Sequence, residues 1–406
     1  MPIGLSYPGN LKPVSGIRLA AASAGIYPSG RADVMLIAME QGAAVSAVFT
    51  KNAFAAAPVS VARDHIGKTS PKYCLVNAGN ANAGTGKIGI SKTLETCIKL
   101  AEISGCRPDE ILPFSTGVIG QDLPSDKICG VLTTLYRDMT DDAWLNCAKA
   151  IMTTDTLPKG VSKQITIEGC PVTVTGIAKG AGMIRPDMAT MLAFIATDAN
   201  IEKNILDEML MTSMNLSFNR ICIDGDMSTN DACVVMASGK AEMQKITSVS
   251  SAACHLLQSA LNEVCILLAQ SIVRDGEGIT KFVTVTVEDG KNSEECQNVA
   301  YAIATSPLVK TAFFASDPNW GRILAAVGRS GIRDLDITRV CIYLNDVTIV
   351  TDGSRDRRYS EEQGKKAMSA PEIHLRIVLN RGTSSETVWT TDFSYEYVRI
   401  NAEYRS

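Results

Sequence analysis

The sequence predicts a mixed α/β fold, because helical and strand patterns alternate along the whole chain. Several strand pairs are joined by short turns. Such hairpins require antiparallel pairing, so a purely parallel sheet is not expected. At ~150 residues per domain, the 406 residues are enough for two or three domains, or for one large domain with two layers of core. No Pro- or Ser-rich linker, repeat or low-complexity tract marks a boundary.

The individual elements follow from the spacing of apolar residues. Helical spacing covers three stretches, at 91–104, 201–216 and 248–274. Strand pairs flank short turns in three places, which are 163–167 with 172–177, 339–344 with 347–351, and 373–379 with 385–393. Further strands are expected at 73–76, 111–114 and 191–196.

Composition excludes several classes of protein. Apolar residues make up 46% of the chain and charged residues 20%, which is typical of a folded globular protein and excludes disorder. The net charge of −4 and the 5% aromatic content give no basic or stacking surface for a nucleic acid. No stretch of ~18 uninterrupted apolar residues could cross a membrane, and no secretion signal opens the chain. We therefore expect a soluble, cytoplasmic protein without nucleic-acid or membrane partners.

The cysteines and histidines give no metal or disulfide pattern. No two of the 12 cysteines are close enough to form a CxxC motif, so reduced, mostly buried thiols are expected. The three histidines are far apart in the sequence, and none has a partner at ligand spacing. A metal site or a histidine-based catalytic triad is therefore not expected.

Two polar loops match known motifs only in part. Gly84–Gly89 fits GxGxxG, but 77–83 separate it from the preceding strand and the next expected strand ends in Ser115-Thr116-Gly117 without an acid. A tight turn is favoured over a nucleotide site. Asp224–Asp231 begins like a calcium loop, but Thr229 replaces the required Gly and Val235 the closing Glu. A hydrogen-bonded turn is favoured there too.

A Gly- and Pro-containing segment, 179–190, runs directly into the apolar strand at 191–196. If the chain were cut before Thr190, the new α-amine and the threonine hydroxyl would belong to one residue. An α-amine has a pKa of about 7.7–8.0, so it could take the proton of its own hydroxyl without a histidine. The alternative is a threonine that simply opens a buried strand, and the residues alone favour that alternative.

At this segment the chain resembles the ornithine acetyltransferase family, the glutamate N-acetyltransferases of the cyclic arginine pathway. The resemblance covers nearly the whole chain. Its motifs are VFTKN (48–52), AAPV (56–59), VNAGNANAGTG (76–86), STGVIG (115–120), MTTDT (152–156), KGAGMIRPDMATMLAFIATDA (179–199), DGDMSTNDA (224–232), DGEGITK (275–281), DPNWGRILAAVG (317–328) and INAEYRS (400–406). The departures from the usual family pattern are mild, at Ala78, Gly84, Arg185, Asp187, Ile279 and Ser406.

The resemblance implies an N-terminal-nucleophile-like fold, a layered sandwich of helices and mixed sheets. It further implies self-cleavage between Ala189 and Thr190, which gives an α chain of 1–189 and a β chain of 190–406 that form one composite active site. Thr190 would then accept the acetyl group of N2-acetylornithine as an ester and pass it to glutamate in a ping-pong cycle. Two α and two β chains are expected to assemble into a heterotetramer.

The remaining site residues are also carried over from the resemblance. Thr116 and Gly117 resemble the oxyanion hole, although such a sequence can also be a simple strand-to-loop turn. Lys179 would suit a substrate carboxylate, and the alternative is a solvated loop lysine. Glu277 would suit the ammonium group of ornithine, and the alternative is a carboxylate at the end of a helix. Thr153, Asn401 and Ser406 resemble further substrate contacts. For the last two, a loose C-terminal tail is the alternative.

The resemblance implies no bound cofactor and no metal. It leaves open whether acetyl-CoA is also a donor, because some relatives are bifunctional and others transfer only from acetylornithine. The nearest alternative function is a self-processing amidohydrolase or aminopeptidase, which would pass the acyl group to water. A nucleotide-binding oxidoreductase and an uncleaved amino-acid-binding protein are further alternatives.

Overall fold

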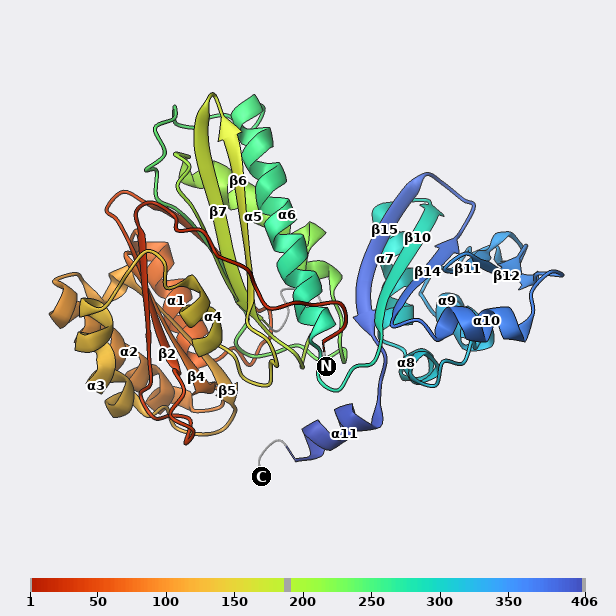
Figure 1. Ribbon diagram of the computed structural model, residues 1–406, viewed down its shortest axis with the longest axis horizontal. Coiled ribbons are helices and arrows are strands. Elements are labelled where there is room, and N and C mark those ends of the chain that lie inside the picture. Colours follow the sequence, from red (N-terminus) through yellow and green to blue (C-terminus); the bar gives the residue numbers. More distant parts are fainter. Residues whose placement is uncertain (1, 186–190, 404–406) are drawn as a thin grey trace.

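The computed structural model describes residues 2–185 and 191–403, which form two lobes (Figure 1). The first lobe holds two sheets and the helices that cover them, and the second lobe holds a third sheet. Among the contacts between the two lobes, residues 221–222 lie beside Trp389, and the Cys222 N–H donates to the Trp389 carbonyl at 2.9 Å.

The first sheet of the first lobe has the order β1-β2-β4-β5. Its strands are β1 (Ile17–Ala22), β2 (Val34–Met39), β4 (Tyr73–Asn80) and β5 (Ile111–Val118). The β4–β5 pair is parallel, and α2 (Gly86–Ser104) makes the crossover between them, followed by η1 (Pro108–Glu110). The other helices that accompany this sheet are α1 (Ala57–Lys68), α3 (Ser125–Arg137) and α4 (Trp144–Ala150).

The second sheet has the order β3-β9-β8-β7-β6. Its strands are β3 (Ala44–Phe49), β6 (Lys159–Ile167), β7 (Cys170–Lys179), β8 (Leu192–Thr197) and β9 (Ala232–Ala237). The β8–β9 pair is parallel and the other pairs are antiparallel. The accompanying helices are α5 (Lys203–Leu216), η2 (Phe218–Arg220) and α6 (Ala252–Arg274).

Three apolar clusters arrange these elements in four layers. One cluster lies between the two sheets and joins side chains such as Ile37 and Phe114 of the first sheet to Phe194 and Val234 of the second. The outer face of the first sheet packs on α2 and α3, and that of the second sheet packs on α5 and α6. This helix–sheet–sheet–helix order confirms the predicted layered α/β sandwich.

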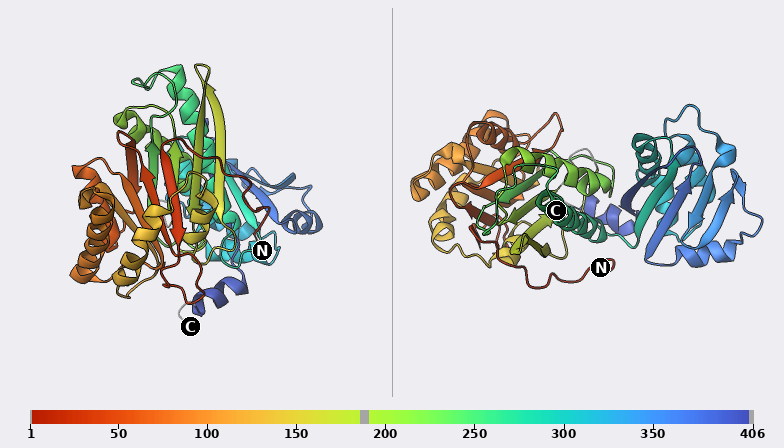
Figure 2. Two further views of the ribbon diagram at one scale, coloured as in Figure 1. Left: turned by 60° about the vertical axis from the view of Figure 1, so that its left-hand side comes forward. Right: turned by 90° about the horizontal axis from the view of Figure 1, so that it is seen from above.

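The second lobe is a six-stranded sheet of order β13-β12-β11-β14-β10-β15. Its strands are β10 (Phe282–Gly290), β11 (Cys341–Leu344), β12 (Val347–Thr351), β13 (Ser354–Arg355), β14 (Glu372–Val378) and β15 (Ser384–Thr391). The helices of this lobe are α7 (Ser293–Ala304), α8 (Pro307–Phe314), α9 (Trp320–Gly328), η3 (Ile337–Arg339) and α10 (Glu361–Met368). Seen from above, the lobe stands apart from the four-layer sandwich (Figure 2).

Two of the three predicted hairpins are confirmed, and the third is wrong. The strands β6 and β7 pair across a turn in which Glu168 and Gly169 both have positive φ, and β11 pairs with β12. The expected pairing of 373–379 with 385–393 does not occur, because β10 lies between β14 and β15 and pairs with both. The two strands are close together in the sequence, but they are not neighbours in the sheet.

The long helix α6 is apolar and long enough by composition to cross a membrane, but it is a core helix. Eleven of its residues are buried, and they pack on the second sheet and α5. The twelve cysteines are all free, and nine of them are buried, as predicted. Burial raises the pKa of the Cys97 and Cys265 thiols to about 12, so both are protonated at neutral pH.

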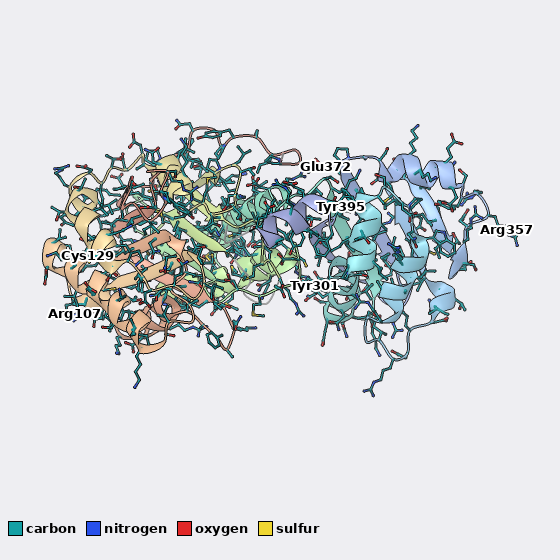
Figure 3. The ribbon with its side chains drawn as sticks, turned by 90° about the horizontal axis from the view of Figure 1, so that it is seen from below. Arg107, Cys129, Tyr301, Arg357, Glu372 and Tyr395 are labelled. Atoms are coloured by element: carbon teal, nitrogen blue, oxygen red, sulfur yellow. The ribbon has the colours of Figure 1, made fainter. Side chains whose placement is uncertain are left out.

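The last helix, α11 (Tyr395–Ala402), leaves the second lobe and lies across the junction towards the first lobe (Figure 1). Seen from below, it spans the space between the two lobes, with the exposed Tyr395 at its start (Figure 3). The Ser394 side chain caps the helix by accepting from the Tyr397 N–H. The segment before the terminus is therefore an ordered helix between the lobes.

Candidate active site

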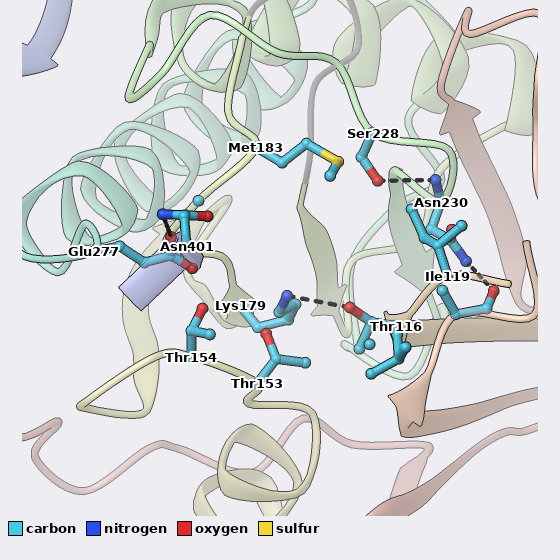
Figure 4. Close-up of a pocket in the computed structure, with 14 residues that line it drawn as sticks. Thr116, Ile119, Thr153, Thr154, Lys179, Met183, Ser228, Asn230, Glu277 and Asn401 are labelled. Atoms are coloured by element: carbon cyan, nitrogen blue, oxygen red, sulfur yellow. Dashed lines mark hydrogen bonds between the residues drawn. The ribbon is translucent and has the colours of Figure 1, made fainter. Parts of the chain in front are cut away.

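A cavity of about 260 Å³ opens where loops from both sheets meet α11 (Figure 4). Its lining comes from the end of β5, the loop after α4, the end of β7, the 224–231 loop, the segment after α6, and α11. The lining residues are Ala81, Thr116, Gly117, Val118, Ile119, Thr153, Thr154, Lys179, Gly182, Met183, Ser228, Asn230, Glu277 and Asn401.

Thr116 and Gly117 lie at the end of β5, where it runs very close to β4. Gly117 has φ of +135°, and a Cβ there would lie 2.3 Å from the Gly79 carbonyl carbon. Only glycine fits this crossing. The Asn230 side chain fixes the same region, since its Nδ2 donates to the Ser115 carbonyl at 2.9 Å and to the Ala81 carbonyl at 2.6 Å.

Lys179 ends β7 and points into the cavity, although it is almost fully buried. Its Nζ donates to the Thr116 hydroxyl oxygen at 3.1 Å. Because the lysine supplies this hydrogen, the hydroxyl's own proton can be donated elsewhere. Burial lowers the pKa of Lys179, while the Asp155, Asp231 and Glu277 carboxyls act in the opposite direction.

A buried ion cluster behind Lys179 holds the loop that carries Thr153. Lys159 Nζ lies 2.6 Å from Asp155 Oδ1 and 2.7 Å from Asp275 Oδ2. Asp155 also accepts from the Thr153 and Gly180 N–H groups, at 3.0 and 2.8 Å. Burial alone raises the pKa of the Asp155 carboxyl, but the Lys159 and Lys179 charges outweigh it and hold that pKa well below its usual range.

Glu277 follows α6 and faces the cavity opposite Thr116 (Figure 4). Its carboxylate accepts from Asn401 Nδ2 at 2.8 Å, so α11 is tied to the first lobe. The backbone of Gly182 runs against the same carboxylate, where a Cβ would lie 2.5 Å from Glu277 Oε2. For Asn401, the alternative of a loose tail is therefore wrong.

The Asp224–Asp231 loop forms one wall of the cavity and directs its carboxyls to the backbone. Asp224 accepts from the Met183 and Ile184 N–H groups, at 2.5 and 2.9 Å, and burial raises the pKa of its carboxyl. Among residues 2–185 and 191–403, no group of three His, Cys, Asp or Glu side chains could hold a metal ion. The loop is a hydrogen-bonded turn, as favoured from the sequence.

The Gly84–Gly89 loop is also closed by its own side chains. The Thr85 hydroxyl donates to Asn82 Oδ1 at 2.8 Å, and Asn82 Nδ2 donates to the Gly89 carbonyl at 3.0 Å. Gly86 then begins α2. These contacts fit the tight turn that the sequence favoured over a nucleotide site.

The cavity brings together six of the residues predicted from the sequence, which are Thr116, Gly117, Thr153, Lys179, Glu277 and Asn401. Ala189, Thr190 and Ser406 lie outside the described residues. Sequence reasoning missed Ser228 and Asn230 in the cavity wall, and Asp155, Lys159 and Asp275 behind it. Their signal was the density of short polar residues in MTTDT and DGDMSTNDA, which was interpreted as turn structure.

The four-layer sandwich and its charged cavity define an α/β enzyme whose site lies at the ends of strands from both sheets. A family model described as the ArgJ family matches residues 18–406. The chain belongs to the ArgJ family, which are acyltransferases of arginine biosynthesis, as the sequence motifs implied.

Curated relatives match this chain over 97–100% of their own length. The chain is 52% identical to the arginine biosynthesis bifunctional protein ArgJ of Pseudomonas syringae pv. tomato, over all of both chains. It is 54% identical to the protein of that name from Methylococcus capsulatus, over 98% of this chain and 97% of the relative. The crystal structure of the Bacillus halodurans protein of that name is 39% identical, with a TM-score of 0.51 over 53% of this chain and 100% of that chain.

Proposed function

We propose that this protein transfers the acetyl group of N2-acetyl-L-ornithine to L-glutamate through an acetyl ester of Thr190. In this proposal the chain first cuts itself between Ala189 and Thr190. The α chain, 1–189, and the β chain, 190–406, then share one active site. The observation that carries the proposal is the convergence of six predicted residues on one cavity.

The position of the proposed cut is compatible with a shared site. Met183 lines the cavity, and Met191 directly precedes β8, with its carbonyl accepting from the Ala232 N–H at 3.0 Å. The strands on either side of the cut, β7 and β8, are paired in one sheet from Val174↔Thr197 to Lys179↔Leu192. This pairing would keep the two chains together after the peptide bond is broken.

The charges of the cavity complement an amino acid. Lys179 stands on one wall and Glu277 with Asn401 on another (Figure 4). In our proposal the lysine binds the substrate carboxylate and Glu277 the ammonium group, with Thr153, Asn401 and Ser406 as further contacts. N2-acetylornithine carries one carboxylate and one side-chain ammonium group, so these two walls match the charges of the proposed donor.

The reaction is a double displacement. The Thr190 hydroxyl oxygen attacks the acetyl carbonyl carbon, and its proton passes to the α-amine of the same residue. Thr116 and the Gly117 N–H stabilise the oxyanion. The C–N bond to ornithine breaks as the α-ammonium returns the proton to the leaving nitrogen. The glutamate amine then attacks the ester, and the threonine hydroxyl is restored.

The cycle exchanges one amide for another, so it needs no ATP, metal or bound cofactor. Acetyl-CoA as a second donor would form the same acetyl ester, because a thioester acylates a hydroxyl readily. We further propose that two α and two β chains form a heterotetramer in the cytoplasm.

The test begins with a denaturing gel and amino-terminal sequencing of the purified protein. The proposal predicts two fragments, one of which begins Thr-Met-Leu-Ala-Phe, and a single uncut chain for Thr190→Ala. Activity is then measured with N2-acetylornithine and glutamate. N-acetylglutamate formed together with ornithine supports the transferase, whereas free acetate without N-acetylglutamate would show an amidohydrolase. An uncut but folded wild-type chain would remove the proposed nucleophile.

A further inference from the structure

The loop between β1 and β2, residues 23–33, has no role in the proposed mechanism, yet it lies against two parts of the cavity wall. It folds around Asp33, which is fully buried. The Asp33 carboxylate accepts from the Ala24, Ile26 and Tyr27 N–H groups, at 2.6, 2.7 and 3.1 Å. A carboxylate that accepts three backbone hydrogen bonds holds this loop in one conformation.

Two side chains of the loop, Arg31 and Tyr27, reach the carbonyl of Met152 in the loop after α4. The Arg31 guanidinium carbon lies 3.9 Å from the centroid of the Tyr27 ring. Arg31 Nη2 donates to the Met152 carbonyl, and the Tyr27 hydroxyl donates to the same oxygen at 3.5 Å. The ring and the carbonyl set the position of the guanidinium, because Arg31 Nε is buried and has no hydrogen-bond partner among the described residues.

The peptide group between Met152 and Thr153 is held at both of its polar atoms. The two loop side chains bind its carbonyl, and its N–H donates to Asp155 Oδ2 at 3.0 Å. A peptide group is planar, so holding both atoms fixes the direction in which the chain enters Thr153. Thr153 lines the cavity, and these contacts therefore orient a residue of the site itself.

The same loop also lies against the crossing of β4 and β5, which carries the proposed oxyanion residues. A Cβ on Gly79 of β4 would lie 2.7 Å from Ile26 Cγ2 and 3.3 Å from the Tyr27 ring. Gly117 of β5 approaches the same Gly79 backbone, where a Cβ on Gly117 would lie 2.3 Å from the carbonyl carbon. One loop therefore supports the Gly117 and the Thr153 parts of the cavity.

We propose that Arg31, stacked on Tyr27, is a positioning residue that directs Thr153 for substrate binding. This inference rests on the proposed function, in which Thr153 is a substrate contact. Arg31 is not among the residues that line the cavity, so it acts through the Met152–Thr153 peptide group. Its loss should weaken the binding of substrate and of transition state alike, which raises KM and leaves kcat nearly unchanged.

The test measures KM and kcat of Arg31→Gln with N2-acetylornithine and glutamate, per chain that begins with Thr190. We expect KM for N2-acetylornithine to rise about five- to fiftyfold, with kcat within about threefold of wild type. Arg31→Lys should show a similar rise, because an ammonium group lacks the flat, forked guanidinium that stacks on the ring. An unchanged KM for Arg31→Gln, or full recovery in Arg31→Lys, would overturn the inference.

A double-mutant cycle shows whether Arg31 acts through Thr153. Thr153→Val removes the hydroxyl and keeps the volume of the side chain. If Arg31 only positions this hydroxyl, adding Arg31→Gln to Thr153→Val should raise KM by less than about twofold. A general disturbance of the fold would act independently of the hydroxyl. Fold-changes that multiply in the double variant would therefore overturn the inference.

Arg376 in β14 of the second lobe is a matched control. Its guanidinium carbon lies 4.3 Å from the centroid of the Tyr343 ring, and its Nε is likewise buried without a hydrogen-bond partner in the described part of the chain. Arg376→Gln should leave KM at the wild-type value. If Arg31→Gln does not fold, Tyr27→Leu removes the ring beneath the guanidinium. The same rise in KM is then expected, and an unchanged KM would again overturn the inference.

The outcomes also separate this inference from the proposed function. A folded wild-type chain that forms no N-acetylglutamate would overturn both. An active wild type, together with an unchanged KM in Arg31→Gln or with multiplying effects in the cycle, would overturn the role of Arg31 alone.

Discussion

Of the two glycines that line the cavity, Gly117 leaves less room for a side chain than Gly182. A methyl group there would meet the Gly79 and Asn80 backbone at 2.3 and 2.5 Å, and the φ of +135° is unfavourable for any other residue. We expect Gly117→Ala to lower the free energy of unfolding by about 2–4 kcal/mol. Urea denaturation measures this loss. Gly130→Ala in α3, where a Cβ meets nothing within 4 Å, is the control and should be neutral or stabilising.

Thr116 offers a test of the oxyanion role at the same point of the fold. Thr116→Val keeps the volume of the side chain and removes the hydroxyl that accepts from Lys179. We expect kcat to fall by about 10²–10³-fold with little change in KM, because the lost contact acts in the transition state. Thr116→Ser, which retains the hydroxyl, should keep most of the activity. A wild-type kcat for Thr116→Val would contradict the role.

At the scale of single residues, the sequence predicted the cavity residues that belong to recognised motifs. It did not predict the residues that hold them in place. Lys179 and Glu277 were found because they match the family. Asn230 and Asp231 lie in a loop whose short polar residues also fit an ordinary turn. They contact Ser115 and Met191, respectively, which are far away in the sequence. No local pattern specifies such long-range contacts.

At the scale of elements, a buried ion cluster holds the loop after α4. Asp275, which follows α6, accepts from Lys159 Nζ and from the Thr156 and Leu157 N–H groups, at 2.7, 2.9 and 3.2 Å. Asp275→Asn leaves Lys159 with one carboxylate, so we expect a loss of about 3–5 kcal/mol in the free energy of unfolding.

Thermal and urea denaturation check this value. The exposed pair Lys203–Asp207 on α5 supplies the control, and Asp207→Asn there should cost at most about 0.5 kcal/mol. An equal, small effect of both substitutions would show that the buried cluster does not stabilise the loop.

Lys310 ties α8 to β15 and should give the second lobe a pH dependence. Its Nζ donates to Thr390 Oγ1 at 2.9 Å and to the Thr391 carbonyl, and burial lowers the pKa of Lys310 to about 8. Between about pH 8 and 10.5 the unfolded chain holds a proton that the folded chain has lost, so this lysine makes stability rise with pH.

Lys310→Met should abolish that contribution. The difference in unfolding free energy between wild type and variant is expected to change by up to about 3 kcal/mol from pH 8 to pH 10.5, in favour of wild type at high pH. Denaturation at several pH values measures it, with Lys203→Met on the surface as control. A difference that stays constant over this range would contradict the buried, titrating lysine.

Sequence patterns predicted the helices better than the order of the strands. The three predicted helices at 91–104, 201–216 and 248–274 correspond to α2, α5 and α6, because their apolar spacing is strong and local. The pairing of 373–379 with 385–393 failed because β10, about 90 residues earlier, is inserted between them. Sheet order is set by packing across the whole lobe, which spacing along the chain does not record.

For the whole molecule, the sheet that contains β7 and β8 spans the proposed cut. If the strands hold the two fragments together, cutting should not change the native size. We expect wild type and Thr190→Ala to elute alike under native conditions, at about twice the 43.4 kDa of one chain. Only a denaturing gel should separate the wild-type fragments. A smaller native size for the cut protein would contradict the shared sheet.

The division into lobes was not visible in the sequence. The second lobe begins at β10, directly after the Glu277 segment, without a linker of distinct composition. Its helix α11 then returns to the first lobe through Asn401. The site is thus built from both lobes. The segment that joins the lobes contributes to this site, which explains why its composition is not that of a flexible linker.

The most direct test of the central claim is to trap the acetyl-enzyme. The purified protein is mixed with N2-acetylornithine without glutamate, and the mass of each fragment is measured. The account predicts one acetyl group on the fragment that begins with Thr190, release of one ornithine, and loss of the acetyl group to N-acetylglutamate when glutamate is added. An unmodified fragment, or an acetyl group that leaves only as acetate, would contradict the transfer through Thr190.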